Sequence, residues 1–275
     1  MFPSALDSIA ISMDNAKSCP TFGRGCIVSE ESVKDINLLE MPLEGIAAYW
    51  LSLKKVMGIK YVPKVIQDEA ENTEEPYIKY LLETCFTGAS EADVRRLGMI
   101  RRESTLRELR LKLTLMREAL VAIAAADNPR KALLRMGSYL PEPSLTEENL
   151  TKMALDMVRL AETGKDSYVV TVEASLPAEQ LILKLFFYVL WARREGKAGL
   201  EPMAENGRCR YFNQGLGMVM DGFERGFVLG CLEIAAEEML GAATVKMNLA
   251  LDMALALRTK ISYEDLFKVA RAHML

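Results

Sequence analysis

Histidine is almost absent from the sequence: His273 is the only one among 275 residues. A zinc site that uses histidine and a Ser-His-Asp triad both need an imidazole placed among matched ligands or beside a nucleophile, so the composition argues against both. The five cysteines are odd in number, widely spaced and form no CxxC, which fits neither a zinc framework nor a disulfide scaffold. We therefore expect no metal, no cofactor and the reducing conditions of the cytoplasm, and we interpret His273 as a packing or surface residue.

Excess positive charge and long apolar segments are also missing. The formal net charge is −4 and the sequence pI is about 5.4, which argues against a dedicated binder of nucleic acid or of anionic membranes. The longest apolar run, 181–192, contains Lys184 and falls short of the roughly 18 to 20 residues that span a bilayer. The first residues lack the pattern of a signal peptide. We expect no nucleic-acid partner and no membrane span.

What the sequence does contain is helical periodicity. Half of the residues are hydrophobic and 26% are charged, which suits one or two soluble globular domains. Apolar residues recur at spacings of three and four in 43–53 and in 111–126, as on one face of a helix. Ser144 and Glu147 have the spacing of a capping box and predict a further helix. The only β-like run, 167–172, is too short to form a sheet alone, so the sequence predicts an all-α fold.

The two halves of the sequence resemble each other. Aromatic and glycine positions in 49–58 recur in 187–196 at an offset of 138, and 112–140 aligns without a gap with 246–274 at an offset of 134. Ordered blocks at nearly one offset are typical of an internal duplication. The predicted organisation is a loosely ordered leader at 1–33, a first helical unit at 34–141, a linker with one helix at 142–171 and a second, quasi-equivalent unit at 172–275.

Several blocks in these halves form a recognisable pattern. The segment 192–196 reads Ala-Arg-Arg-Glu-Gly and is followed by Leu-Glu at 200–201, and 212–222 reads Phe-Asn-Gln-Gly-Leu-Gly-Met-Val-Met-Asp-Gly. In the first half, 123–129 reads Ile-Ala-Ala-Ala-Asp-Asn-Pro and 136–140 reads Met-Gly-Ser-Tyr-Leu. These blocks resemble the cytoplasmic parts of the flagellar motor stator protein MotA. The resemblance covers 40–141 and 172–275.

The resemblance implies a soluble, non-catalytic protein of the flagellar motor, whose helical units are similar to the cytoplasmic domain of MotA. MotA has four membrane spans, two of them between the Asp-Gly helix and the terminal helix. The corresponding segments here are about a dozen and about two dozen residues long, which leaves no room for an ion channel. By the resemblance, the partner is the rotor switch protein FliG or a stator protein. The implied location is the cytoplasm, peripheral to the inner membrane at the motor, and self-association is a further expectation.

The resemblance also implies a candidate contact site in the second half. In MotA the positions of Arg193 and Glu201 face the rotor, and Arg194 and Glu195 adjoin them. An arginine guanidinium offers a permanently charged fork to partner carboxylates, and Glu201 offers the reciprocal acceptor. If one helix continued past Gly196, the spacing of eight residues between Arg193 and Glu201 would place them near one edge of that helix.

Three further residues are candidates for partner binding. Lys54 and Lys55 occupy the corresponding place in the first half, and Asp221 is a candidate loop acceptor beside Gly222. Each candidate has a plainer alternative. The arginines and Glu195 also fit an ordinary solvated helix end with internal ion pairs, and Asp221 also fits a simple turn residue.

Other classes of function stay open at this stage. A structural or assembly factor would pair with MotA-like domains through apolar helix faces. An enzyme is disfavoured, because adjacent carboxylates such as Glu147 and Glu148 point apart on a helix. The basic stretch 95–117, with eight arginines and lysines, fits either contact with an acidic partner or the solvated face of a helix, and the methionine-rich faces are expected to fill the core.

Overall fold

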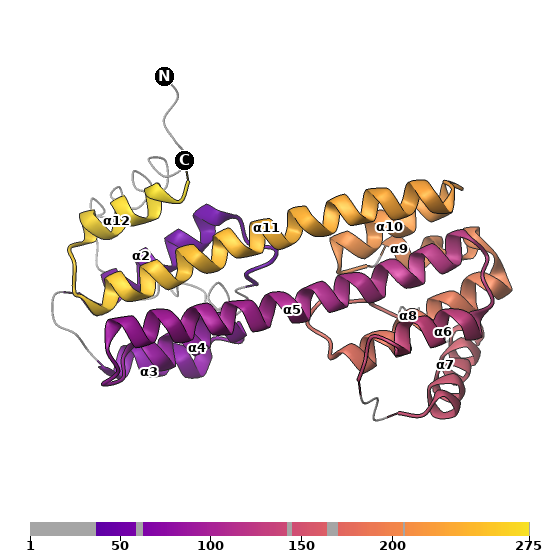
Figure 1. Ribbon diagram of the computed structural model, residues 1–275, viewed down its shortest axis with the longest axis horizontal. Coiled ribbons are helices and arrows are strands. Elements are labelled where there is room, and N and C mark those ends of the chain that lie inside the picture. The colour runs from indigo at the N-terminus through magenta and orange to yellow at the C-terminus, as the bar shows by residue number, and fades with distance from the viewer. Residues whose placement is uncertain (1–36, 59–62, 142–144, 164–169, 206, 275) are drawn as a thin grey trace, which may run out of the picture. The chain divides into compact units, whose positions relative to one another are not determined.

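The computed structural model describes residues 37–58, 63–141, 145–163, 170–205 and 207–274 (Figure 1). These residues form helices joined by loops, and no strand occurs among them, so the predicted all-α fold is confirmed. The predicted leader, 1–33, lies outside the described residues. The chain divides into two compact units: unit 1 combines the residues up to Thr105 with Ala242–Leu275, and unit 2 is Leu106–Gly241.

Unit 1 is built around the aromatic side chains of its first helices. Trp50 and Tyr77 are fully buried, and the apolar periodicity noted in 43–53 is buried with them. The end helix α12 packs against α2. The helices of unit 1 are α2 (Leu43–Met57), α3 (Pro63–Asn72), α4 (Pro76–Cys85), the first part of α5 (Glu91–Ala124), the last part of α11 (Arg225–Arg258) and α12 (Tyr263–Ala272).

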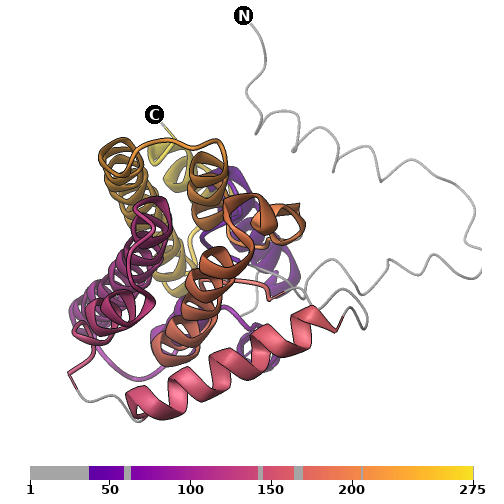
Figure 2. The same ribbon diagram turned by 90° about the vertical axis from the view of Figure 1, so that its right-hand side faces the viewer.

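Unit 2 is centred on α8, whose apolar residues are buried by several neighbours. Tyr188 packs edge-to-face on Phe212, with ring centroids 5.0 Å apart, and its hydroxyl donates to the Val170 carbonyl at 2.6 Å. Helices α6 and α7 both pack on α8. Figure 2 shows α7 along its whole length. The helices of unit 2 are the last part of α5, α6 (Pro129–Gly137), α7 (Glu147–Glu162), α8 (Ala178–Glu195), the 3₁₀ helix η3 (Lys197–Leu200), α9 (Glu201–Glu205), α10 (Arg210–Met220) and the first part of α11.

The compact units differ from the ranges predicted from the sequence. The sequence halves, 34–141 and 172–275, would each keep their own end helix, α6 or α12. In the structure α6 packs on α8, and α12 packs on α2. Each long helix, α5 or α11, contributes its first part to one unit and its last part to the other. Each unit therefore contains the end helix of the opposite sequence half.

Several local features recur at the predicted offset of 134. Helices α5 and α11 are both 34 residues long and begin 134 positions apart. The Tyr77 hydroxyl donates to the Gly98 carbonyl at 3.3 Å, and the Tyr211 hydroxyl donates to the Leu232 carbonyl at 3.1 Å. After each long helix, one non-glycine residue has a positive φ: 52° at Ala126 and 58° at Lys260.

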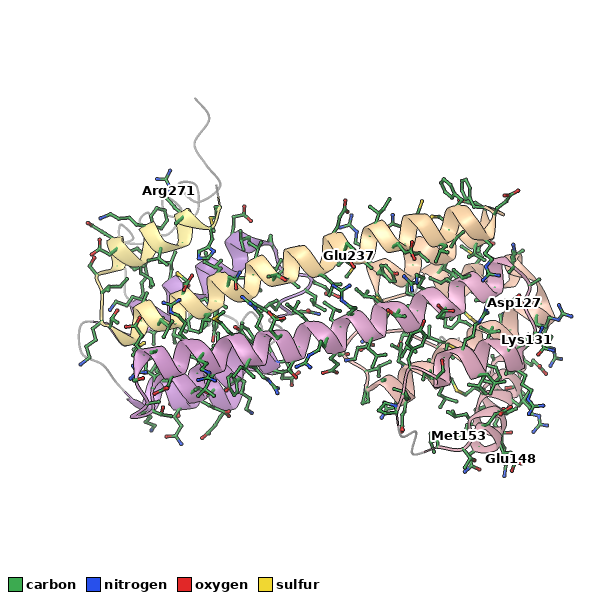
Figure 3. All side chains as sticks on the ribbon, viewed as in Figure 1. Asp127, Lys131, Glu148, Met153, Glu237 and Arg271 are labelled. Atoms are coloured by element: carbon green, nitrogen blue, oxygen red, sulfur yellow. The ribbon has the colours of Figure 1, made fainter. Side chains whose placement is uncertain are left out.

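The helix predicted after Ser144 is present as α7, with two differences. Its N-cap is Thr146, whose side chain accepts the Asn149 N–H at 3.3 Å, and Ser144 lies outside the described residues. Met153 of α7 is exposed, whereas Met247 and Met253 of α11 are buried. The expected role of methionine as core filler therefore applies to Met247 and Met253 and not to Met153, which is labelled in Figure 3.

Within the described part of the chain, α11 alone is long and apolar enough to cross a membrane by length and composition. Of its most apolar 18-residue window, 56% is buried inside the protein. The core helix of a soluble protein has the same properties, so α11 does not by itself indicate a span.

Candidate protein-contact site

The predicted contact residues of the second half lie around a break that follows α8. Gly196 has a φ of 77° and ends α8, and the chain continues as η3 and then α9, which begins at Glu201. A positive φ is readily adopted by glycine and disfavours continuation of the helix. Arg193 and Glu201 therefore belong to different helices, and the single-helix geometry considered for this pair does not occur.

This turn is held in place by side-chain hydrogen bonds. The Trp191 indole Nε1 donates to the Gly199 carbonyl at 2.8 Å, and Lys197 Nζ donates to the Ala124 carbonyl at the end of α5 at 3.0 Å. A Cβ atom on Gly199 would lie 2.6 Å from Cβ of Glu195, so the close approach requires glycine. The backbone that carries Arg193 and Glu201 is thus fixed to the body of unit 2.

Arg193 and Glu201 are both exposed. Neither side chain has an ion pair or hydrogen bond with any residue that the structure describes. The two opposite charges are free to meet an external partner.

Arg194 and Glu195 behave differently from Arg193. Arg194 forms ion pairs with Glu162 of α7 and, through Nε at 3.3 Å, with Glu195 Oε1. The alternative interpretation of internal pairing therefore applies to these two residues. Arg194 connects α8 to α7. Its charge is therefore already paired within unit 2.

The remaining predicted residues are not part of this turn. Lys54 and Lys55 belong to unit 1, where Lys54 is half-buried and Lys55 Nζ lies 5.2 Å from the centroid of the Tyr263 ring. That cation–π contact connects α2 to α12. Asp221 is exposed at the end of α10, where its N–H donates to the Gly217 carbonyl, so the backbone of Asp221 adopts the turn that was its plainer alternative.

The basic stretch of α5 pairs with acidic residues of α11. In unit 1, Arg95 Nη1 lies 2.8 Å from Asp252 Oδ1. In unit 2, Arg110 Nη1 lies 2.7 Å from Glu237 Oε1, an oxygen of the residue labelled on α11 in Figure 3. A further pair in unit 2 joins Arg117 to Glu233 at 3.2 Å. Several basic side chains of the stretch therefore form ion pairs between α5 and α11, in addition to the solvated helix face that the sequence suggested.

Two exposed aromatic residues were not selected from the sequence. Phe223 lies just before α11 and Phe227 lies in its first turn, and the two rings are stacked with centroids 4.7 Å apart. The pattern that could have identified them is the aromatic pair at a spacing of four directly after the Asp-Gly turn. Two exposed and stacked phenylalanines are a common mark of a contact surface.

The metal-ligating and nucleophilic side chains of the described residues are scattered or buried. No group of three or more histidine, cysteine, aspartate or glutamate side chains in the described ranges could hold a metal ion. Burial raises the pKa of the Cys85 thiol to about 12, and a thiol that stays protonated is a poor nucleophile. A shallow hollow beside α7 is lined by that helix alone, from Glu147 to Arg159.

Comparison with models of known protein families, with curated proteins and with solved structures finds no match to this chain.

Proposed function

We propose that the chain is a non-catalytic protein that binds a charged protein partner through the turn after α8. The observation that supports this most is the pair of opposite charges, Arg193 and Glu201, exposed on a fixed backbone. Neither has a partner among the residues that the structure describes. A surface of this kind fits a partner that presents a carboxylate to Arg193 and a basic side chain to Glu201.

The rigidity of the turn favours binding. Because Trp191 and Lys197 hold its backbone, little additional ordering of the main chain is needed when a partner docks. Exposed charges at the edge of an interface mainly set the rate of approach, the orientation and the choice of partner. We therefore expect a contact that is rapid, reversible and sensitive to salt.

The proposed partner follows from the resemblance to MotA. The positions of Arg193 and Glu201 correspond to rotor-facing positions in that family, so the rotor switch protein FliG is the first partner to test, followed by a stator protein. On this proposal the chain works in the cytoplasm, at the flagellar motor and peripheral to the inner membrane. The support is the set of residues quoted for the resemblance, together with the exposure of Arg193 and Glu201.

We propose further that the two sequence halves are copies of one module. The support is geometric: helices of equal length, tyrosine hydrogen bonds and positive φ angles all recur at the offset of 134. The proposal accounts for the exchange of end helices, since α6 and α12 occupy corresponding places on α8 and α2.

An assembly factor is the second candidate function. The exposed apolar residues Phe223 and Phe227 favour it, because burial of aromatic rings against a MotA-like domain would stabilise a complex with little dependence on salt.

The experiment is affinity capture of the tagged chain from its own cells at low salt, followed by identification of the retained proteins. Three variants are compared with the wild type: Arg193→Glu, Arg193→Glu with Arg194→Glu, and a control in which Lys131 of α6 and Lys152 of α7 are changed to Glu. Both control lysines are exposed, and Lys131 is labelled in Figure 3. Circular dichroism checks that each variant retains its helicity.

The proposed contact predicts that one protein, FliG or a stator protein, is retained by the wild type and by the control and is lost with Arg193→Glu. The wild type should also lose it at high salt. If Arg193→Glu retains the same proteins as the wild type, the proposed site is wrong. If retention persists in high salt and in all variants, the assembly function through apolar faces is favoured instead.

A further inference from the structure

Helix α7 is attached to the rest of unit 2 through a narrow strip of side chains. Three of its sixteen residues, Leu150, Ala154 and Val158, are buried, at a spacing of four that places them on one side of the helix. Two other apolar residues of α7, Met153 and Leu160, have exposed fractions of 43% and 53%. An element with few buried apolar contacts opens locally at a low cost in free energy.

An ion pair with a neighbouring helix holds each end of α7. In the first turn, Glu147 Oε1 lies 2.8 Å from Nε of Arg130 on α6, and in the last turn Glu162 pairs with Arg194 of α8. Both pairs are partly exposed, and pairs of this kind contribute little to stability and are weakened by salt. The helix dipole disfavours a carboxylate in the last turn. Glu162 therefore stabilises α7 only while Arg194 lies beside it.

The surface of α8 that α7 covers is apolar. Five consecutive residues of α8, Leu185 to Val189, are buried, and five consecutive residues of a helix point to all of its sides. Helices α6, α7 and η3 each pack on a part of this surface. Displacement of α7 would therefore expose apolar side chains of α8. It would also release the charge of Arg194, which adjoins Arg193 in the chain.

The turn that carries Arg193 is held independently of α7. The hydrogen bonds of Trp191 and Lys197 fix its backbone, and both end on carbonyls outside α7. The turn therefore keeps its conformation when α7 is displaced. In that state Arg193 and Arg194 would offer two adjacent positive charges beside an apolar surface.

We propose that α7 is an intramolecular cover of the contact site, and that the protein partner supplies a helix that takes its place on α8. The chemistry of α7 defines that helix: apolar residues at a spacing of four, with a carboxylate that reaches Arg194. Amphipathic helices bind apolar surfaces through anchors at such spacings. This inference rests on the proposed function, and it adds the class of partner and the regulation of the same site.

A cover weakens the binding of a partner in a defined way. The partner helix docks only on the fraction of molecules in which α7 is displaced, so the apparent dissociation constant is the intrinsic one divided by that fraction. A substitution that displaces α7 should therefore tighten binding. If α7 were part of the contact surface, the same substitution would weaken binding.

Two variants displace α7 in different ways. Ala154→Glu places a charge at a fully buried position of the strip. Glu162→Arg replaces the ion pair with Arg194 by two like charges. Met153→Glu is the control, because it adds the same charge as Ala154→Glu to the same helix, at the exposed position labelled in Figure 3. Circular dichroism checks that each chain is folded, and if Ala154→Glu is not, Glu162→Arg carries the test.

Hydrogen exchange of the full chain, without any partner, measures the opening of α7. We expect the amides of α7 to exchange faster in both variants than in the wild type and the control. A synthetic peptide with the sequence 145–163 then tests whether α8 accepts such a helix. The peptide should bind the displaced variants at least about tenfold more tightly than the wild type, whose own α7 occupies the surface. Equal binding to all forms, or binding to none, would overturn the inference.

The partner of the Arg193 turn gives the comparison that separates a cover from a contact surface. Its dissociation constant should fall at least about threefold in both variants relative to the wild type and the control, and the 145–163 peptide should displace it from them. Unchanged or weaker binding in the variants, or no displacement by the peptide, would overturn this inference and leave the proposed function standing. Absence of a partner for every form of the chain, the displaced variants included, would overturn both.

Discussion

At the scale of the residue, neighbouring side chains of the same type have different roles. Arg193 has no partner among the described residues, whereas Arg194 pairs with Glu162 of α7 and with Glu195. The sequence could indicate both as charges near a helix end, because a motif records residue types and order. It could not separate them, because Arg194 acquires its role from α7, which reaches it only through the tertiary fold.

Glu75 gives a pH-dependent prediction at this scale. Its carboxylate caps α4 by accepting the Ile78 N–H at 2.7 Å, and burial raises its pKa despite that bond and the nearby Arg101. Because the pKa of Glu75 is higher in the folded than in the unfolded state, protonation of this carboxyl stabilises the fold. That stabilisation is complete at pH values below the pKa of the unfolded state. It is lost as pH rises from about 4 through the folded pKa.

Glu75→Gln keeps an acceptor for Ile78 and removes the charge. We expect its free energy of unfolding, relative to the wild type, to be higher at pH 7 than at pH 4, as measured by urea denaturation at both values. Glu74→Gln, at an exposed neighbouring position, serves as the control and should show no such trend. An equal difference at both pH values for Glu75→Gln would contradict the assignment.

At the scale of the element, the periodicity of apolar residues predicted which face of a helix is buried. The buried faces of α2 and of the last part of α5 follow the apolar spacing in 43–53 and 111–126. Their ends were harder to predict, because a cap depends on which side chain reaches a backbone N–H. Thr146 caps α7 in this way, two residues after the serine that the sequence pattern indicated. Likewise Gly196 can be tolerated inside a helix or can end it, and only the packed structure shows that it ends α8.

Two glycines of α10 give a prediction for this helix. A Cβ atom on Gly215 would lie 2.4 Å from Cδ1 of Leu120 and 3.1 Å from Cδ2 of Leu232, both buried, whereas a Cβ on Gly217 would meet nothing within 4 Å. Gly215→Ala should therefore lower the free energy of unfolding by about 1 to 3 kcal/mol through overpacking. Gly217→Ala should raise it by about 0.5 to 1 kcal/mol through helix propensity. Urea denaturation measures both, and a stabilised Gly215→Ala would show that α10 is not packed closely on α5 and α11 there.

At the scale of the whole molecule, the sequence predicted the all-α class and not the grouping of the helices. Periodicity shows which face of a helix is buried, and it does not show which helix covers that face. The apolar faces of α6 and α12 are covered by α8 and α2, from the opposite sequence halves. The ion pairs of α5 with α11 also join residues more than 100 positions apart, beyond the reach of any local pattern.

The exchange of end helices predicts how separated halves will behave. The segments 34–141 and 172–275 each lack parts of both compact units. We expect each one alone to have low helicity and no cooperative thermal transition. Produced together, with a tag on only one of them, they should purify as a pair and regain the circular dichroism of the intact chain. A half that melts cooperatively as a single folded copy would show that the exchanged packing is not needed for folding.

The central claim, that Arg193 on its fixed turn binds a protein partner, is tested most directly by an affinity ratio. The dissociation constant of the captured partner is measured for the wild type, for Arg193→Glu and for the control with Lys131→Glu and Lys152→Glu, at low salt. The account predicts that Arg193→Glu binds at least about tenfold more weakly, about 1.4 kcal/mol, while the control stays within about twofold of the wild type, the scale of a peripheral charge. Equal dissociation constants for the wild type and Arg193→Glu would contradict it.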